Sequence, residues 1–189
     1  MIVDSEYQEH AVFSELERFI VFYRDLARSV FPWISQGTGA IYSIDSYVFS
    51  SIQGTLTSIR MILADGRIND GYALLRKYYD SVIINIYTIL YLQENFSIQN
   101  FVVDHIRDWL KGVARLPEYR VMSQYIRESE TTRSITALLY ADDRYRSIRE
   151  RCNDHTHYNF YQYVLLNDNE VSVPDRLTVL DQFLIDVRD

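Results

Sequence analysis

The chain has 189 residues, of which 48% are hydrophobic, so one folded domain with a real core is expected and a disordered chain is excluded. Six glycines and three prolines leave little material for tight turns, and this favours long helices over a β-rich fold. The net charge of −7 argues against a general binder of duplex DNA. The charge is unevenly spread, because residues 101–151 hold ten Lys/Arg and eight Asp/Glu.

A first helix is predicted from Asp4 or Ser5, either of which can cap it, to Pro32, which stops it. Its apolar stripe recurs at spacings of three and four residues: Phe13, Leu16, Ile20, Tyr23, Ala27 and Val30. The glycine-containing segment 32–43 is then predicted to be a loop.

A second helix is predicted from Asp45 or Ser46 to a glycine C-terminus at Gly66. Its apolar face has the members Val48, Ile52, Leu56, Ile59 and Leu63. A third helix starts near Asn69 and contains the most apolar segment of the chain, so we expect it to be central. Its predicted core arc is Leu75, Tyr79, Val82, Ile86, Ile89 and Leu90, and we expect Leu75, Val82, Ile86 and Ile89 to be buried.

Shorter helices are predicted further along the chain, at 98–111, 117–128, 131–140 and from about 142 onward. Ser97 is expected to cap the first of these, and Gly112 to end it. Residues 167–169 mark a break, after which Pro174 leads a last amphipathic helix with Leu177, Leu180, Leu184 and Val187. We therefore expect an all-α, single-domain antiparallel helical bundle over 1–189. The apolar periodicity of the last helix continues to Asp189, as in a chain that has further C-terminal sequence.

No secretory leader is visible near the N-terminus, and the uncharged apolar run 81–93 is too short to span a bilayer. A single cysteine excludes an internal disulfide and a multi-cysteine zinc site. The sequence thus predicts a cytoplasmic protein without membrane association, and it suggests neither a cofactor nor a metal site.

The segment 146–159, RSIRERCNDHTHYN, concentrates two of the four histidines, the only cysteine and three arginines. On a helix that turns roughly 100° per residue, Arg144, Arg151 and His155 lie within about 40° of one another. Arg151 and His157 are six residues apart and diverge on a straight helix. They come together only where the helix ends or bends, or where a second chain completes the site.

Four interpretations of this segment are open. A metal site would use His155, His157 and Asp154, although H-x-H is a spacing typical of strands and loops. Cys152 could act as a nucleophile with a neighbouring histidine. An RNA-cleaving site would use a histidine for proton transfer at the ribose 2′-hydroxyl and an arginine to hold the phosphate. The fourth interpretation is a set of hydrogen-bonded surface or interface residues near a helix end.

The spacing from Arg151 to His157, R-x5-H on a late helix of an all-α bundle, resembles the HEPN superfamily of small helical domains. Arg149 and His155 have the same spacing, and the helix 65–80 with Leu74-Leu75-Arg76 and Asp80 is similar to a helix of HEPN-like abortive-infection-type proteins. Cys152 stands where the family often has a polar residue, and Asn159 stands where its toxin branch often has a tyrosine.

The resemblance implies a bundle that dimerises, with the arginine and histidine facing a cleft between subunits. Many HEPN proteins are metal-independent endoribonucleases of defence or toxin systems, including phage defence, and others are non-catalytic interaction or nucleotide-binding modules. In the enzyme, Arg151 would hold phosphate, His157 would be the general acid/base and His155 the reserve histidine. The expected supporting and substrate-binding residues are Asn153, Arg76, Asp80, Arg144, Arg149 and Tyr158.

Two further expectations follow for the partners of this segment. At least one of Arg76 and Asp80 is expected to contact residues 144–158, because both lie on an otherwise apolar helix and need partners. The alternative is a plain intrahelical ion pair between them at the surface. The chain is expected to form a homodimer through the face that carries 144–158, with RNA or a nucleotide as the ligand. The alternative is a monomer whose tyrosines line helix seams.

Overall fold

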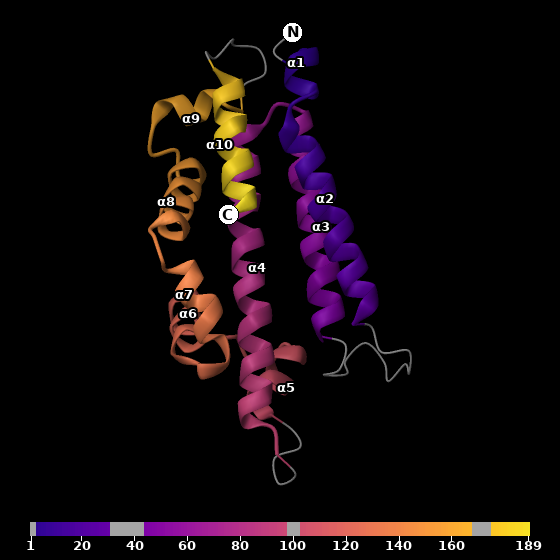
Figure 1. The fold of residues 1–189 in the computed structure, drawn as a ribbon, viewed down its shortest axis with the longest axis vertical. Helices are drawn as coiled ribbons and strands as arrows, with labels where there is room; N and C mark the ends of the chain where they lie inside the picture. The colour runs from indigo at the N-terminus through magenta and orange to yellow at the C-terminus, as the bar shows by residue number, and fades with distance from the viewer. Residues whose placement is uncertain (1–2, 31–43, 98–102, 168–174) are drawn as a thin grey trace.

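The computed structural model describes residues 3–30, 44–97, 103–167 and 175–189, and this part of the chain is all-α, without a strand (Figure 1). The prediction of an all-α helical bundle is confirmed. The helices are α1 (Ser5–Gln8), α2 (Ala11–Ser29), α3 (Ile44–Ala64), α4 (Ile68–Asn95), α5 (Asp104–Leu110), α6 (Tyr119–Glu128), α7 (Arg133–Leu139), α8 (Arg144–Thr156), α9 (Tyr161–Leu165) and α10 (Arg176–Arg188), with a 3-10 turn at Glu130–Thr132.

Helix α4 is the axis of the bundle, as its length and apolar character predict. It lies between a pair formed by α2 and α3 on one side and a layer formed by α6, α7 and α8 on the other (Figure 1). Helix α10 packs along the N-terminal half of α4 and ends beside its middle. Helix α8 runs antiparallel to α4, so the segment 146–159 is held against the first half of the central helix.

The turn between α3 and α4 depends on two glycines. Gly66 has φ +79, the left-handed conformation that favours glycine, and it follows α3 as the sequence predicts. Gly71 allows α4 to approach α3 closely, because an added Cβ would lie 2.7 Å from Leu63 Cδ2.

The predicted first helix is divided at His10. This residue is extended, and its Nδ1 accepts a hydrogen bond from the Val12 N–H, which caps α2 and separates it from α1. The buried stripe of α2 largely matches the expectation: Val12, Leu16, Ile20, Tyr23 and Ala27 are buried, whereas Val30 is exposed. The predicted loop 32–43 lies outside the described residues.

The predicted core arc of α4 is only partly correct. Leu75 is fully buried, but Val82, Ile86 and Ile89 are intermediate, and the buried apolar positions of the second half are Ile83, Tyr87 and Leu90. The reason is that α4 has neighbours on several sides, so one arc does not describe its core. Asn69 and Tyr87, which lie outside the predicted arc, are buried as well.

The later helices follow the prediction with shifted ends. Within the described residues α5 begins after Val103, so Ser97 does not cap it. Gly112 follows the C-cap residue Lys111 and has φ +69, so the helix ends at the predicted glycine. Helix α10 begins at Arg176, and the side chain of Asp175 accepts the Thr178 N–H. None of the described helices combines the length and the apolar character needed to cross a membrane.

Candidate functional site

Arg151 lies on α8 and points toward α10, where its Nε is 3.1 Å from Asp186 Oδ2. Asp186 is 1% exposed, and it also accepts hydrogen bonds from the Tyr72 hydroxyl at 3.2 Å and from Gln182 Nε2 at 3.0 Å. Burial raises the pKa of Asp186, while Arg151 and these hydrogen bonds oppose that shift. The arginine of the R-x5-H motif is therefore the counter-ion of a buried carboxylate.

His155 is enclosed in the core. Its ring is stacked between Tyr72 and Tyr163, with both pairs of ring centroids 3.9 Å apart. Its Nδ1 is 2.9 Å from Asn69 Oδ1, and Asn69 Nδ2 donates to the His155 carbonyl at 2.9 Å, so Nδ1–H is the donor of the first bond. Burial, and secondarily the charge of Arg151, lower the pKa of His155 to about 4. The imidazole is neutral near pH 7 and has little contact with solvent, which does not suit the reserve role in proton transfer.

His157 is the C-cap of α8, and its side chain is exposed. The helix ends in a Schellman arrangement, because Asn159 N–H donates to Asp154 C=O at 3.0 Å and Tyr158 N–H donates to His155 C=O. Tyr158 occupies the left-handed position of this motif with φ 50, where glycine is the usual residue. Arg151 and His157 thus face different surroundings within one chain, as the helical spacing predicts.

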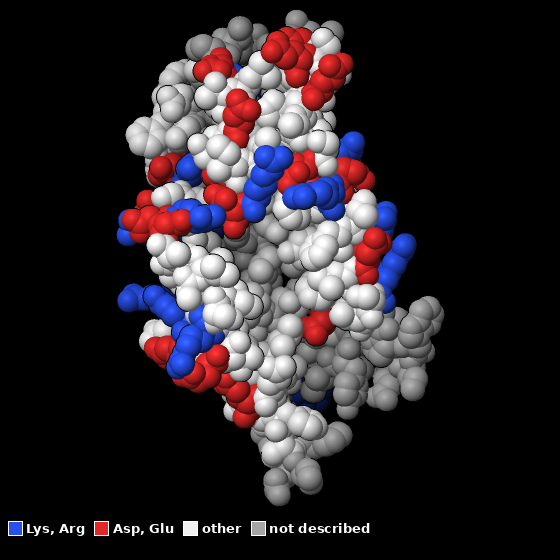
Figure 2. Space-filling model, in the orientation of Figure 1, with Lys and Arg blue, Asp and Glu red and all other residues white. Residues whose placement is uncertain are grey.

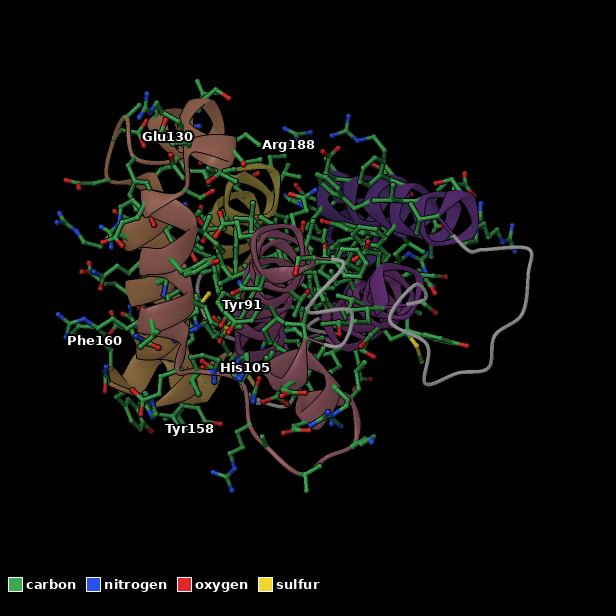
Figure 3. The ribbon with its side chains drawn as sticks, turned by 90° about the horizontal axis from the view of Figure 1, so that it is seen from below. Tyr91, His105, Glu130, Tyr158, Phe160 and Arg188 are labelled. Carbon is green, nitrogen blue, oxygen red and sulfur yellow. The ribbon has the colours of Figure 1, made fainter. Side chains whose placement is uncertain are left out.

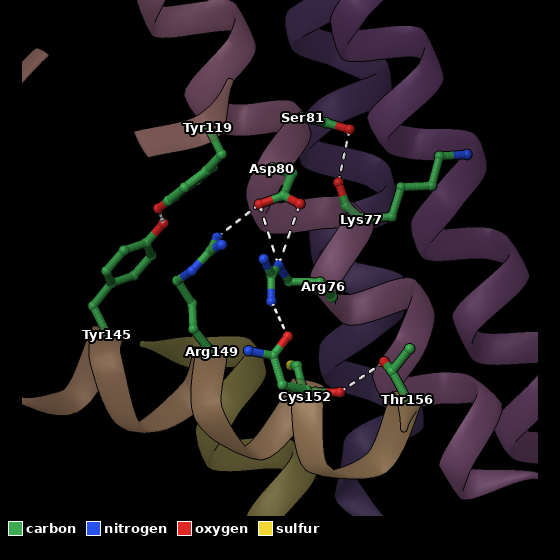
Figure 4. Close-up of polar contacts among 10 residues, drawn as sticks. Arg76, Lys77, Asp80, Ser81, Tyr119, Tyr145, Arg149, Cys152 and Thr156 are labelled. Atoms are coloured by element: carbon green, nitrogen blue, oxygen red, sulfur yellow. Dashed lines mark hydrogen bonds and ion pairs between the residues drawn. The ribbon is translucent and has the colours of Figure 1, made fainter. Parts of the chain in front are cut away.

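Four of the predicted supporting residues form one cluster between α4 and α8 (Figure 4). Arg76 Nε donates to Asp80 at 3.2 Å, Arg149 Nη1 donates to the same carboxylate at 2.7 Å, and Arg76 Nη1 donates to Asn153 Oδ1. The prediction that Arg76 or Asp80 contacts the 144–158 segment is confirmed for both residues. Arg149 also lies over the ring of Tyr119, with its Cζ 3.5 Å from the ring centroid.

Arg144 lies apart from that cluster, at the start of α8. It pairs with Asp142 at 2.8 Å and with Asp189 at 3.4 Å, and its side chain is half exposed. Figure 2 shows basic and acidic side chains side by side across the middle of the face that it draws. Arg144 is therefore a paired surface residue at the far end of α8 from His157.

Cys152 is fully buried, and burial raises the pKa of its thiol to about 12, with the charge of Asp186 acting in the same direction. A thiol in this setting is protonated at neutral pH, which does not favour the nucleophile interpretation. Within the described part of the chain, no three His, Cys, Asp or Glu side chains gather in a way that could hold a metal ion.

Sequence reasoning missed the partners that fix the motif residues in place. The sequence did indicate a partner for Asp186. This residue lies three positions after Phe183, on the apolar face of the last helix, and a buried carboxylate needs a cation beside it. Asn69 and Tyr72 carried none, because their contacts with His155 join residues 86 and 83 positions apart in the chain. Tyr119 and its hydroxyl partner Tyr145 were also missed.

A scan against models of protein families finds no match for this chain. Searches of curated proteins and of solved structures find no match either. The fold and the site geometry are therefore the observations on which a function rests.

Proposed function

We propose that this chain is a HEPN-like helical module that pairs with a second copy of itself and acts through this pairing, without catalysis. The observation that carries the proposal is an exposed aromatic surface directly after α8. It consists of Tyr158, Phe160, Tyr161 and Val164, and we refer to it as the aromatic patch.

The aromatic patch is unusually exposed for apolar side chains that lie close together. Phe160 is 54% exposed and Tyr161 is 76% exposed. Figure 3 shows Tyr158 and Phe160 on the outer side of the molecule, away from α2 and α3. Tyr163 of α9 stacks on His155 and packs against the main core. Helix α9 is therefore anchored to the bundle through Tyr163, while Tyr161 and Val164 of the same helix are exposed to solvent. Clustered exposed aromatic side chains are typical of protein interfaces.

A second copy is the partner that suits the charge of this surface. Residues 158–167 contain no Asp, Glu, Lys or Arg, although the chain as a whole carries −7. Two copies can therefore meet at the aromatic patch with little repulsion. A two-fold contact would bury the same residues of both copies.

The internal use of the motif residues favours a module over an enzyme. Arg151 is bonded to the buried Asp186, and His155 is enclosed by aromatic rings, so each has its partners within one subunit. A substrate phosphate would have to compete with a buried carboxylate for Arg151. This competition is unfavourable because it would leave Asp186 without its cation.

Light scattering of purified protein at micromolar concentration, together with matched serine variants, tests the proposal. Phe160 and Phe22 are both 54% exposed, but Phe22 lies on α2, away from the patch. We expect a dimer for the wild type and for Phe22→Ser, and a dimer at least about tenfold weaker for Phe160→Ser. A monomeric wild type, or equal weakening by both variants, would contradict the proposal.

A metal-independent endoribonuclease of a defence or toxin system is the second candidate, and the exposure of His157 beside the aromatic patch favours it. Pairing through this patch would bring the two copies of His157 near one axis, where an arginine of the other copy could complete a site. Incubation of assorted RNAs in EDTA, with wild type and His157→Ala, separates the candidates. Cleavage that disappears in the variant would establish the enzyme, and intact RNA with both proteins supports the module.

A further inference from the structure

The polar cluster of Arg76, Asp80, Arg149 and Asn153 has more cationic than anionic groups. Two guanidinium groups share the single carboxylate of Asp80, so the formal charge of the cluster is +1 in a chain of −7. Arg151, the next arginine along α8, adds no excess charge because Asp186 balances it. The seam between α4 and α8 is thus locally positive.

Hydrogen-bond donors of this cluster remain open to solvent. Arg76 uses Nε for Asp80 and Nη1 for Asn153, and its Nη2 has no partner among the described residues. Asn153 accepts through Oδ1, and its Nδ2 likewise has no protein partner in the part of the chain that the structure describes. The Arg76 side chain is 25% exposed and Asn153 is exposed, so an external acceptor can reach both groups.

The cluster is held in place before any ligand arrives. The Arg149 guanidinium lies 3.5 Å above the Tyr119 ring, and the Tyr119 hydroxyl bonds that of Tyr145 on α8 (Figure 4). Asp80 fixes the Nε edge of Arg76 and the Nη1 end of Arg149. An arginine guanidinium whose orientation is already fixed loses less side-chain entropy when it binds a ligand. Its planar pair of N–H donors also matches the spacing of two phosphate oxygens.

We propose that Arg76, Arg149 and Asn153 bind a phosphate group, with Asp80 positioning the two guanidiniums and limiting the affinity. The open Nη2 of Arg76 and the Nδ2 of Asn153 would donate to the phosphate oxygens, and Arg149 would contribute charge from beside Asp80. This site is distinct from the aromatic patch and does not require pairing or catalysis. The phosphate can belong to a free phosphate monoester or to the backbone of RNA.

Calorimetric titration with three probes tests the site and distinguishes the two sources. The probes are inorganic phosphate, a 5′-mononucleotide, and a short single-stranded RNA with hydroxyl groups at both ends. Binding of the first two alone assigns the site to a phosphate monoester. Binding of the RNA assigns it to the phosphodiester backbone. Absence of binding by all three at millimolar concentration overturns the proposal.

Asp80→Asn gives the sharpest result, because it changes the cluster from +1 to +2 while keeping an oxygen that accepts from an arginine. We expect the affinity for the bound probe to rise by about tenfold, since one repelling charge is removed within a few ångströms of the ligand. A purely structural cluster predicts a less stable protein with no gain in binding. Unchanged or weaker binding by a folded Asp80→Asn protein therefore overturns the proposal.

Arg76→Gln is expected to weaken binding by at least about tenfold, and Arg76→Lys by less, because lysine keeps the charge but not the fork. Arg146→Gln is the matched control, since Arg146 is an exposed arginine of α8 that pairs with Asp143 outside the cluster. It should change binding by less than about twofold. Equal losses for Arg76→Gln and Arg146→Gln would show only a general effect of charge and would contradict the proposed site. If Arg76→Gln does not fold, Arg76→Lys and Asp80→Asn still decide the outcome.

Discussion

Arg151 and Asp186 form an ion pair that joins α8 to α10, with the carboxylate 1% exposed and the arginine side chain 27% exposed. The arginine that gives the sequence its resemblance to HEPN proteins thus holds the last helix against the bundle. Tyr72 of α4 donates to the same carboxylate, so three helices meet at Asp186. This arrangement gives Arg151 a role in stability that does not depend on any substrate.

Arg151→Gln is expected to destabilise the protein by about 3 kcal/mol, because it leaves the buried carboxylate of Asp186 without its cation. Chemical denaturation monitored by circular dichroism measures the loss. The double variant Arg151→Gln/Asp186→Asn should recover much of it, since no unpaired charge then remains in the core. A single variant as stable as the wild type would show that the pair has no structural role.

His155 makes the stability depend on pH below neutrality. Its pKa is lowered to about 4 in the folded protein, from 6.5 for an ordinary histidine. Above about pH 6.5 the His155 imidazole is neutral in both the folded and the unfolded protein. As the pH falls toward 4 the unfolded chain binds the proton and the folded chain does not. The contribution of the neutral His155 to the free energy of unfolding is therefore fully present above about pH 6.5. It is lost on acidification, by roughly 3 kcal/mol at pH 4.

Denaturation curves at several pH values between 4 and 7 check this dependence. His155→Gln is the matched variant, because glutamine does not titrate and keeps polar groups near Asn69. Other carboxyl groups titrate in both proteins, so the difference between the two slopes isolates the histidine. Parallel pH profiles for the two proteins would exclude the expected role of His155.

Tyr158→Gly should stabilise the single subunit and weaken its pairing. Tyr158 has φ 50, and glycine adopts this left-handed conformation at lower cost, which favours the variant by up to about 1 kcal/mol. The same change removes one ring of the aromatic patch. Denaturation of dilute protein reports the first effect, and light scattering at micromolar concentration reports the second. A variant that is less stable in the dilute sample would disagree with this account of the helix end.

Leu75→Ala and Ile86→Ala should differ in cost although both lie on α4. Leu75 is fully buried in the main core, so its truncation is expected to cost about 2–5 kcal/mol. Ile86 is only partly buried and lines a cavity of about 190 Å³, so its truncation removes fewer contacts and should cost less. Urea denaturation of the two variants gives the comparison. A larger loss for Ile86→Ala would show that this surface is covered in solution.

The sequence predicts the all-α fold, the central place of α4 and the approximate extent of most helices, because these depend on the local periodicity of apolar residues. Gly66 and Gly112 mark helix ends correctly for the same local reason. The contact between α4 and α8 at Arg76 and Asp80 was also predictable, since charged groups on an apolar helix need partners. Periodicity was insufficient for the core of α4, where helices on several sides bury more than one arc.

Tertiary structure alone decided the surroundings of the motif residues. By itself the sequence determined that Arg151 and His157 would diverge on one helix, because that follows from the rise and turn of the backbone. It did not determine that Arg151 would face Asp186, that His155 would lie between Tyr72 and Tyr163, or that the two arginines of the α4–α8 seam would share Asp80. Each of these contacts joins residues far apart in the chain. The packing of whole helices decides which of them meet, and the charge and access of each group depend on that packing.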